Sequence, residues 1–187
     1  MVYIKKIDQH ALIEKTFELL EREGVEAVSM RRLAALMMVR PSSLYHHFPD
    51  KAALLREIAE RGLLMLAAEL KRAAELAMPD PRRRIHAMGM TYREWSLRHP
   101  ELYRLLFADA PPLSEGMSPA SDAAFAPMLT AMGELVGEAK APAATLGTWA
   151  FVHGYVMLEL TGHVRQCLPI EGFQLGLGCF VDGLGRS

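Results

Sequence analysis

The sequence predicts an all-α protein of about nine helices, and three features of the chain support this fold class. Apolar residues recur at helical spacing along most of the chain. No segment alternates apolar and polar residues for long enough to form a sheet. Prolines and glycines separate the helical segments. The 187 residues are 51% hydrophobic and 23% charged, which is typical of a folded globular protein of one or two domains.

The first 52 residues contain three predicted short helices. The first covers 8–24, and its apolar face carries Ile13, Phe17 and Leu20. The second begins after the N-cap residue Ser29 and buries Leu33 with either Leu36 or Met37.

The third predicted helix begins at Pro41, because the first turn of a helix tolerates the missing N–H of proline. Leu44 and Phe48 then face inward, and the helix ends at Pro49 and Asp50. The residues left on its outer face are polar: Ser42, Ser43, Tyr45 and His46.

The rest of the chain is predicted to form six further helices. A long helix from Lys51 to about Leu76 connects two regions, and the next begins near 82 after the break at 78–81. Its inward stripe is Ile85, Met88, Tyr92 and Trp95, and Arg82, Arg83 and Arg84 are interpreted as its solvated start. A short helix in "ELYRLLF" and a loop over 108–121 precede helices at about 120–138, 143–166 and 171–184. The predicted domains are 1–52 and 53–187.

The last two predicted helices are apolar on more than one face, as in "TLGTWAFVHGYVMLELTGHV" and "FQLGLGCFVDGLG". A helix that is apolar all round must be buried, and a partner subunit is the expected cover near the end of a chain. We therefore predict a homodimer in which these two helices of each subunit form a four-helix bundle. Glu159, on the first of them, is interpreted as a buried hydrogen-bond partner or a contact at the dimer seam.

Charge and cysteine content narrow the possible partners. The net charge is −1, so any nucleic-acid binding must be local. Residues 29–51 hold four cations (Arg31, Arg32, Arg40 and Lys51) against the single anion Asp50. Cys167 and Cys179 are too few for a zinc site or a disulfide framework and are expected to be buried thiols. Without a signal peptide or a membrane-spanning run, the protein is expected in the cytoplasm.

A short helix, a turn and a second short helix with polar outer residues form a helix-turn-helix arrangement. The DNA major groove admits one α-helix, whose side chains hydrogen-bond to base edges and phosphates. Ser42, Ser43, Tyr45 and His46 supply such groups, and Arg31, Arg40 and Lys51 supply charge. A metal site at His46 and His47 is disfavoured, because neighbouring helical residues point about 100° apart and no third ligand follows their spacing.

The segment "ALIEKTFELLEREGVEAVSMRRLAALMMVRPSSLYHHFPDKAALL" resembles the DNA-binding region of the TetR (tetracycline repressor) family, with its L-Y-x-H-F-x-x-K pattern. The resemblance implies that Tyr45 and Lys51 contact phosphates and that His47 combines packing with backbone contact. The full set of implied DNA-binding residues is Arg31, Arg40, Ser42, Ser43, Tyr45, His46 and Lys51.

One position departs from the family pattern. Met38 stands in the turn where the family usually has glycine, and a non-glycine residue at positive φ costs about 1 kcal/mol. Either the turn is rearranged or Met38 tolerates the strain.

The segments "HPELYRLLF" and "WAFVHGYVMLEL" resemble the WHG-type ligand-binding domain of some family members, with Trp149, His153 and Gly154 as the signature. This resemblance implies a nine-helix subunit that dimerises through its last two helices and encloses a ligand cavity with its middle helices. Candidate pocket residues are Met88, Tyr92, Trp95, Phe107, Trp149 and His153, although such a stripe also fits a plain core.

The predicted function is a homodimeric, ligand-responsive repressor of a palindromic operator that is released by an unspecified small molecule. No enzyme activity, cofactor or metal is expected. One alternative is a small all-α enzyme that uses His153 or His163 with Glu159, although the sequence lacks a nucleophile elbow and a phosphate loop. Another is a non-specific architectural DNA-binding protein, which would leave the large body of the chain unexplained.

Overall fold

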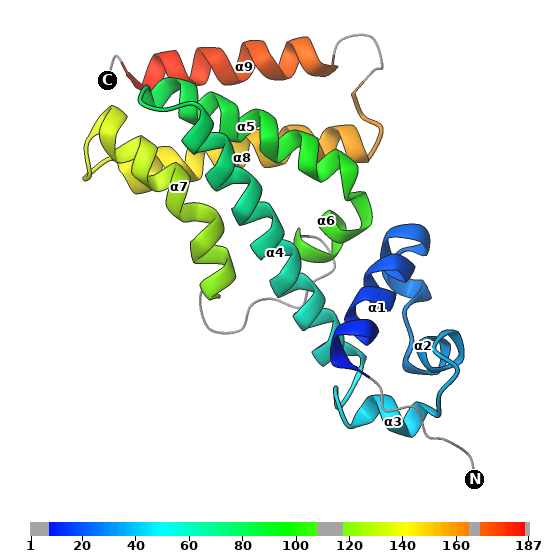
Figure 1. The fold of residues 1–187 in the computed structure, drawn as a ribbon. Helices are drawn as coiled ribbons and strands as arrows, with labels where there is room; N and C mark the ends of the chain where they lie inside the picture. The colour runs from blue at the N-terminus through cyan, green and yellow to red at the C-terminus, as the bar shows by residue number, and fades with distance from the viewer. Residues whose placement is uncertain (1–7, 108–117, 165–168, 186–187) are drawn as a thin grey trace. The chain divides into compact units, whose positions relative to one another are not determined.

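The computed structural model describes residues 8–107, 118–164 and 169–185 (Figure 1). These residues form nine α-helices and one short 3-10 helix, with no strand among them, so the all-α prediction is confirmed. The chain packs as two compact units. Of the described residues, the first unit comprises 8–62 with 99–107, and the second comprises 63–98 with 118–164 and 169–185. The long helix α4 (Lys51–Leu76) contributes residues to both.

The first unit holds the three predicted short helices, α1 (Gln9–Glu23), α2 (Met30–Leu36) and α3 (Pro41–Tyr45), together with a 3-10 turn (Val25–Ala27) and α6 (Pro100–Phe107). The Ser29 hydroxyl accepts a hydrogen bond from the Arg32 N–H at 3.2 Å, so the predicted N-cap of α2 is confirmed. Pro41 occupies the first turn of α3 as predicted.

The buried face of α2 differs from the prediction. Leu33 is fully buried as expected, but Leu36 is 43% exposed and Met37 is half-buried. Met30 and Ala34 pack beside Leu33 instead. At about 100° per residue, the stripe formed by these three residues leaves Leu36 on another side of the helix.

Helix α3 is shorter than predicted, because it ends at Tyr45 and His46 forms its C-cap. The N–H groups of His47 and Phe48 both donate to the carbonyl of Leu44, at 2.9 and 3.0 Å. This turn still brings Phe48 inward, and both Leu44 and Phe48 are buried as predicted.

The second unit is built around α5 (Pro81–Arg98), which packs against α7 (Pro119–Val136), α8 (Ala141–Leu160) and α9 (Pro169–Leu184). Helices α8 and α9 also pack on each other (Figure 1). The predicted inward stripe of α5 is confirmed, since all four of its members are buried: Ile85, Met88, Tyr92 and Trp95.

Three details of the second unit correct the sequence analysis. Helix α8 ends at Leu160 rather than near 166, because Gly162 has a positive φ of 74° and the His163 N–H donates back to the Leu158 carbonyl at 2.9 Å. Arg84 is buried rather than solvated. Cys179 is exposed in the single chain, whereas Cys167 lies outside the described residues.

Among the helices of the described residues, none has the length and apolar character needed to cross a membrane. No group of three or more His, Cys, Asp or Glu side chains in the same ranges is arranged to hold a metal ion.

Candidate functional site

The turn between α2 and α3 keeps its tight form although Met38 replaces glycine. Met38 adopts φ 57°, in the left-handed region that favours glycine. The N–H of Val39 donates to the Ala34 carbonyl at 2.9 Å, which closes the end of α2. The Met38 side chain is 88% exposed, so it meets no steric obstacle. The structure therefore selects the second of the two sequence-based alternatives, in which Met38 tolerates the strain.

Replacing Met38 with glycine is expected to stabilise the protein by about 1 kcal/mol, because glycine adopts positive φ without a Cβ clash. Urea denaturation of Met38→Gly and Met38→Ala separates this effect from loss of the side chain. The alanine variant should match the wild type, since Ala retains the Cβ. If the wild type, Met38→Gly and Met38→Ala were equally stable, the backbone at Met38 would not be strained.

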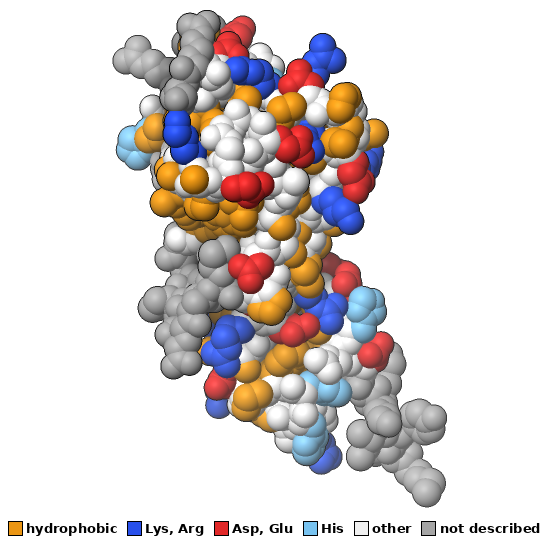
Figure 2. Space-filling model, turned by 90° about the vertical axis from the view of Figure 1, so that its left-hand side faces the viewer, with side chains coloured by type: hydrophobic (Ala, Val, Ile, Leu, Met, Phe, Trp, Pro, Cys, Tyr) orange, Lys and Arg blue, Asp and Glu red, His pale blue; other side chains and the backbone are white. Residues whose placement is uncertain are grey.

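Helix α3 presents the predicted polar side chains, which we call the recognition surface: Ser42, Ser43, Tyr45 and His46. Ser42, Tyr45 and His46 are exposed, and Ser43 is half-buried. The fully buried Leu44 anchors the helix from its opposite side. Histidine and basic side chains gather at the end of the first unit that carries α3 (Figure 2). The surface therefore offers hydrogen-bonding groups on a short helix fixed by its core contact.

The cations around the recognition surface fall into two groups. Arg31 and Arg40 are exposed, whereas Arg32 lies with its Nη2 2.6 Å from Glu23 Oε2. Hydrogen bonds from Arg22 and then Arg32 lower the pKa of the Glu23 carboxyl. Arg32 is thus engaged within the protein, while Arg31 and Arg40 face solvent.

Lys51 has a structural contact that the sequence did not reveal. Its ammonium donates to the Val25 carbonyl at 3.0 Å, which ties the first residue of α4 to the 3-10 turn. Beside it, Asp50 accepts a hydrogen bond from the Ala53 N–H at 2.7 Å. The start of α4 is therefore held in place from two sides.

In the second unit, three predicted pocket residues come together. The Trp149 indole N–H donates to the Tyr92 hydroxyl at 3.3 Å, and that hydroxyl lies 3.5 Å from His153 Nδ1. The Trp149 ring centroid lies 5.2 Å from that of His153 and 5.7 Å from that of Phe125. These contacts join α5, α7 and α8 in one polar and aromatic cluster.

The other three predicted pocket residues have different surroundings. Met88 and Trp95 are fully buried on α5. Phe107 belongs to the first unit, where its ring centroid lies 4.8 Å from that of Tyr103.

Burial lowers the pKa of His153, so its neutral form is favoured in the folded protein. The unfolded chain binds a proton to this residue more readily as the pH falls through its ordinary value of about 6.5. Stability should therefore decrease on acidification across this range, and less so in His153→Gln. Denaturant midpoints measured between neutral and mildly acidic pH test this; parallel pH profiles for the two proteins would contradict it.

A buried ion pair between α5 and α8 was only half predicted. Arg93 donates from Nε to Glu159 Oε2 at 2.8 Å and from Nη2 to Oε1 at 2.6 Å. The two side chains are only 9% and 8% exposed, and the guanidinium carbon lies 5.7 Å from the ring centroid of Phe173. Glu159 is thus the buried hydrogen-bond partner that the sequence suggested, while Arg93 was missed. Because Arg93 engages both carboxylate oxygens, the geometry gives no support to a catalytic His153–Glu159 pair.

Comparisons with known proteins agree with this architecture. Residues 12–58 match the family described as bacterial regulatory proteins, tetR family, and residues 85–173 match the tetracyclin repressor-like C-terminal domain. The uncharacterized HTH-type transcriptional regulator Rv0681 of Mycobacterium tuberculosis is 27% identical over 164 residues, which cover 84% of this chain and 72% of that protein.

Two solved structures extend the likeness. A protein of unknown function from Rhodococcus sp. RHA1 superposes with a TM-score of 0.82 at 28% identity, over 99% of each chain. BioQ, solved with its natural double-stranded DNA operator, superposes with a TM-score of 0.70 at 24% identity, over 97% of this chain and 99% of that one. The BioQ likeness concerns the fold alone. With matches to both the N-terminal and the C-terminal family domains, the chain belongs to the TetR family of transcriptional regulators.

Proposed function

We propose that this regulator is a homodimeric repressor that binds a palindromic operator and releases it when a small molecule binds. In this proposal residues 1–52 form the DNA-binding domain, residues 53–187 form the ligand-binding and dimerisation domain, and the protein acts in the cytoplasm. The main support for this proposal is the exposed recognition surface. The buried Leu44 anchors its helix in the core, and the exposed Arg31 and Arg40 flank it. The BioQ complex supports it, because a protein of the same fold is described with its operator.

The recognition surface gives each residue a distinct role in DNA binding. Short hydrogen-bonding groups such as Ser42 and His46 suit base edges in the major groove. Arg31, Arg40, Tyr45 and Lys51 suit phosphates, which position the helix without reading sequence. Ser43, which is half-buried, is assigned to the backbone at the edge of the surface.

Tyr45→Phe is expected to weaken binding to operator and random DNA alike, because it removes a phosphate contact. Lys51→Ala should do the same and also cost about 1 kcal/mol of stability, since the Val25 carbonyl loses its donor.

Ser42→Ala and His46→Ala should instead change which DNA sequences the protein prefers, with a loss of about 1 to 3 kcal/mol of binding free energy at the affected base. Gel shifts with operator and scrambled DNA measure both effects. If Tyr45→Phe weakened operator binding only, the phosphate assignment would be wrong.

Helices α8 and α9 supply the surface for dimerisation in this proposal. Leu146, Leu158 and Leu175 are 57%, 48% and 70% exposed in the single chain. Exposed leucines along two packed helices favour burial by a second copy. A two-fold dimer would place two recognition surfaces in successive major grooves about 34 to 36 Å apart.

The ligand response is assigned to the second unit. Its candidate pocket residues remain Met88, Tyr92, Trp95, Trp149 and His153, whereas Phe107 belongs to the first unit. The chain of contacts from Trp149 through Tyr92 to His153 offers polar groups beside aromatic rings, which is typical of small-molecule sites. A ligand that binds one conformation of the dimer better shifts the population, and a tenfold loss of DNA affinity needs about 1.4 kcal/mol. Helix α4, which contributes to both units, is the proposed lever.

Gel shifts against the DNA upstream of the protein's own gene test the proposal. A preferred site with steep salt dependence is the expected result. Equal binding to every sequence would favour the architectural alternative. Substrate turnover without DNA affinity would favour the enzyme.

A further inference from the structure

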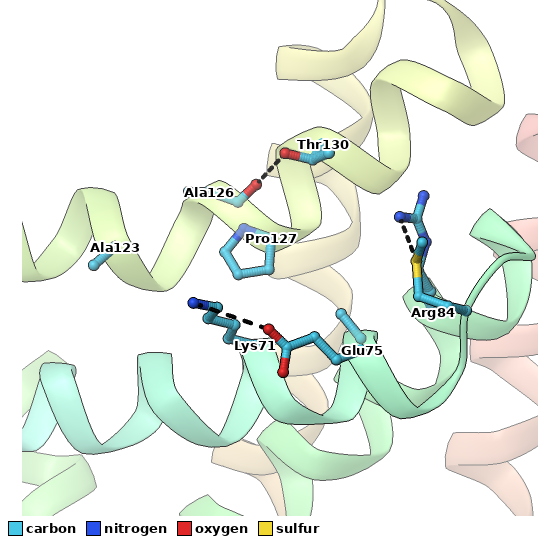
Figure 3. A pocket seen from close by; sticks show the side chains of 9 residues that line it. Lys71, Glu75, Arg84, Ala123, Ala126, Pro127 and Thr130 are labelled. Atoms are coloured by element: carbon cyan, nitrogen blue, oxygen red, sulfur yellow. Dashed lines mark hydrogen bonds and ion pairs between the residues drawn. The ribbon is translucent and has the colours of Figure 1, made fainter.

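A groove of about 320 Å³ lies in the second unit between α4, the start of α5 and α7 (Figure 3). No local spacing in the sequence predicts it. One wall comes from α7, the opposite wall from α4, and Arg84 of α5 closes one end. The residues that matter for its chemistry are Lys71, Glu75, Arg84, Ala123, Ala126 and Pro127.

The wall on α7 is apolar and recessed because of its sequence. Ala123 and Ala126 have small side chains, and α7 bends at Pro127 (Figure 3). Since Pro127 has no N–H, the Ala123 carbonyl receives no hydrogen bond from the residue one turn later. The volume lies at the small end of the range for small-molecule pockets. This wall suits a short aliphatic chain.

Arg84 is the unusual group in the groove. Its side chain is only 7% exposed, and its buried Nε has no acceptor among the described residues. Within the described parts of the chain, Nη1 donates to the Met78 sulfur at 3.3 Å, a weak acceptor, while Nη2 pairs with Glu134. A buried donor without an acceptor costs about 1 to 3 kcal/mol. Because Nε is closed off from solvent, an anionic oxygen in the groove would instead reach Nη1 and replace its weak sulfur acceptor.

A second cation stands across the groove. The side chains of Lys71 and Glu75 are 72% and 64% exposed, and their charged atoms lie 3.9 Å apart (Figure 3). An exposed pair at this distance contributes little and is easily exchanged. Lys71 can therefore turn to an incoming anion. Two acids compete for these cations and would weaken an anion's binding: Glu75, which lines the groove, and Glu134, which pairs with Arg84.

We propose that this groove binds an amphipathic organic anion, with its carboxylate at Arg84 and its aliphatic tail along the Ala123–Pro127 wall. The link to gene regulation rests on the function proposed above, because the groove lies on α4, which also contributes to the first unit. The binding itself does not depend on that function and is measured without DNA.

Isothermal titration calorimetry on the full chain tests the site with decanoate, decanol and decylamine as probes. Decanoate should bind, and the two probes without a carboxylate should bind at least tenfold more weakly. Arg84→Gln should weaken decanoate binding at least tenfold. Glu134→Gln should tighten it, because a competing carboxylate is removed. Arg83→Gln is the matched control, because Arg83 precedes Arg84 in the sequence and its side chain is 81% exposed. This variant should bind decanoate with the affinity of the wild type.

Ala126→Leu keeps the test decisive if Arg84→Gln fails to fold, because Ala126 is exposed and the larger side chain fills the groove. This variant should fold and lose decanoate binding. The proposal is overturned if decanoate does not bind the wild type, if Ala126→Leu binds it as well as the wild type, or if decylamine binds more tightly. If decanoate bound through Arg84 but did not change the affinity for the operator, the groove would still be an anion site. Only its proposed regulatory role would be overturned.

Discussion

Glu159→Ala is expected to lower the free energy of unfolding by about 3 to 5 kcal/mol, which would make it one of the most damaging single substitutions in the protein. The reason is the positive charge of Arg93, which would stay buried after its partner is removed. Arg93 is 9% exposed and uses two nitrogens on the Glu159 carboxylate, so the variant keeps a buried guanidinium without its counter-ion. Urea denaturation followed by circular dichroism measures the loss. The lost contact between α5 and α8 should also broaden signals from the second unit in NMR spectra.

Two further variants separate burial from charge pairing. The double variant Arg93→Met with Glu159→Leu should recover most of the stability, because apolar residues of similar size often replace a buried pair without loss. Glu69→Ala removes a comparable two-bond pair with Arg98, whose side chain is 55% exposed. That exposed pair should be worth less than about 1 kcal/mol. If Glu69→Ala lowered the free energy of unfolding as much as Glu159→Ala does, burial of the ion pair would not be the cause of the loss.

Leu158→Glu is expected to convert the protein into a monomer and to weaken operator binding by about 10² to 10⁴-fold. Leu158 is 48% exposed on α8, and in the proposed dimer a carboxylate there would be buried against a second apolar surface. Loss of the partner removes the second recognition surface, and with it the gain from binding two half-sites at once. Sedimentation velocity gives the oligomeric state, and gel shifts give the affinity.

Leu64→Glu is the matched control for the dimer experiment. Leu64 lies on α4 and is 52% exposed, so the substitution adds the same charge at a similarly accessible leucine. This variant should remain dimeric and bind the operator normally. A Leu158→Glu protein that sediments as the wild type does would refute the assignment of the interface to α8.

The helix pattern of this protein follows from local signals in its sequence. Ser29 and Pro41 mark the starts of α2 and α3, because their caps and first turns depend only on neighbouring residues. The predicted bounds of α4 match the structure, since helical spacing without proline runs from Lys51 to Leu76. The recognition surface could be predicted for the same reason, because an inward Leu44 determines which side of a short helix faces out.

Other features depend on contacts between distant residues. Arg84 and Arg93 look like solvated cations in sequence, yet both are buried against acids from other helices: Glu134 on α7 and Glu159 on α8. No local spacing predicts such a pair. Leu36 was misassigned because the core of the first unit selects the stripe of α2 that contains Ala34.

The sequence by itself therefore determined the fold class, the order of the helices and the polar arc on α3, because helix caps, prolines and apolar spacing act over a few residues. Only the tertiary structure decided that Met38 takes a positive φ, that Arg93 pairs with Glu159, and that α4 and α7 enclose a groove. These features arise when helices far apart in the chain pack together, since packing sets which charges lose water and where small side chains leave space.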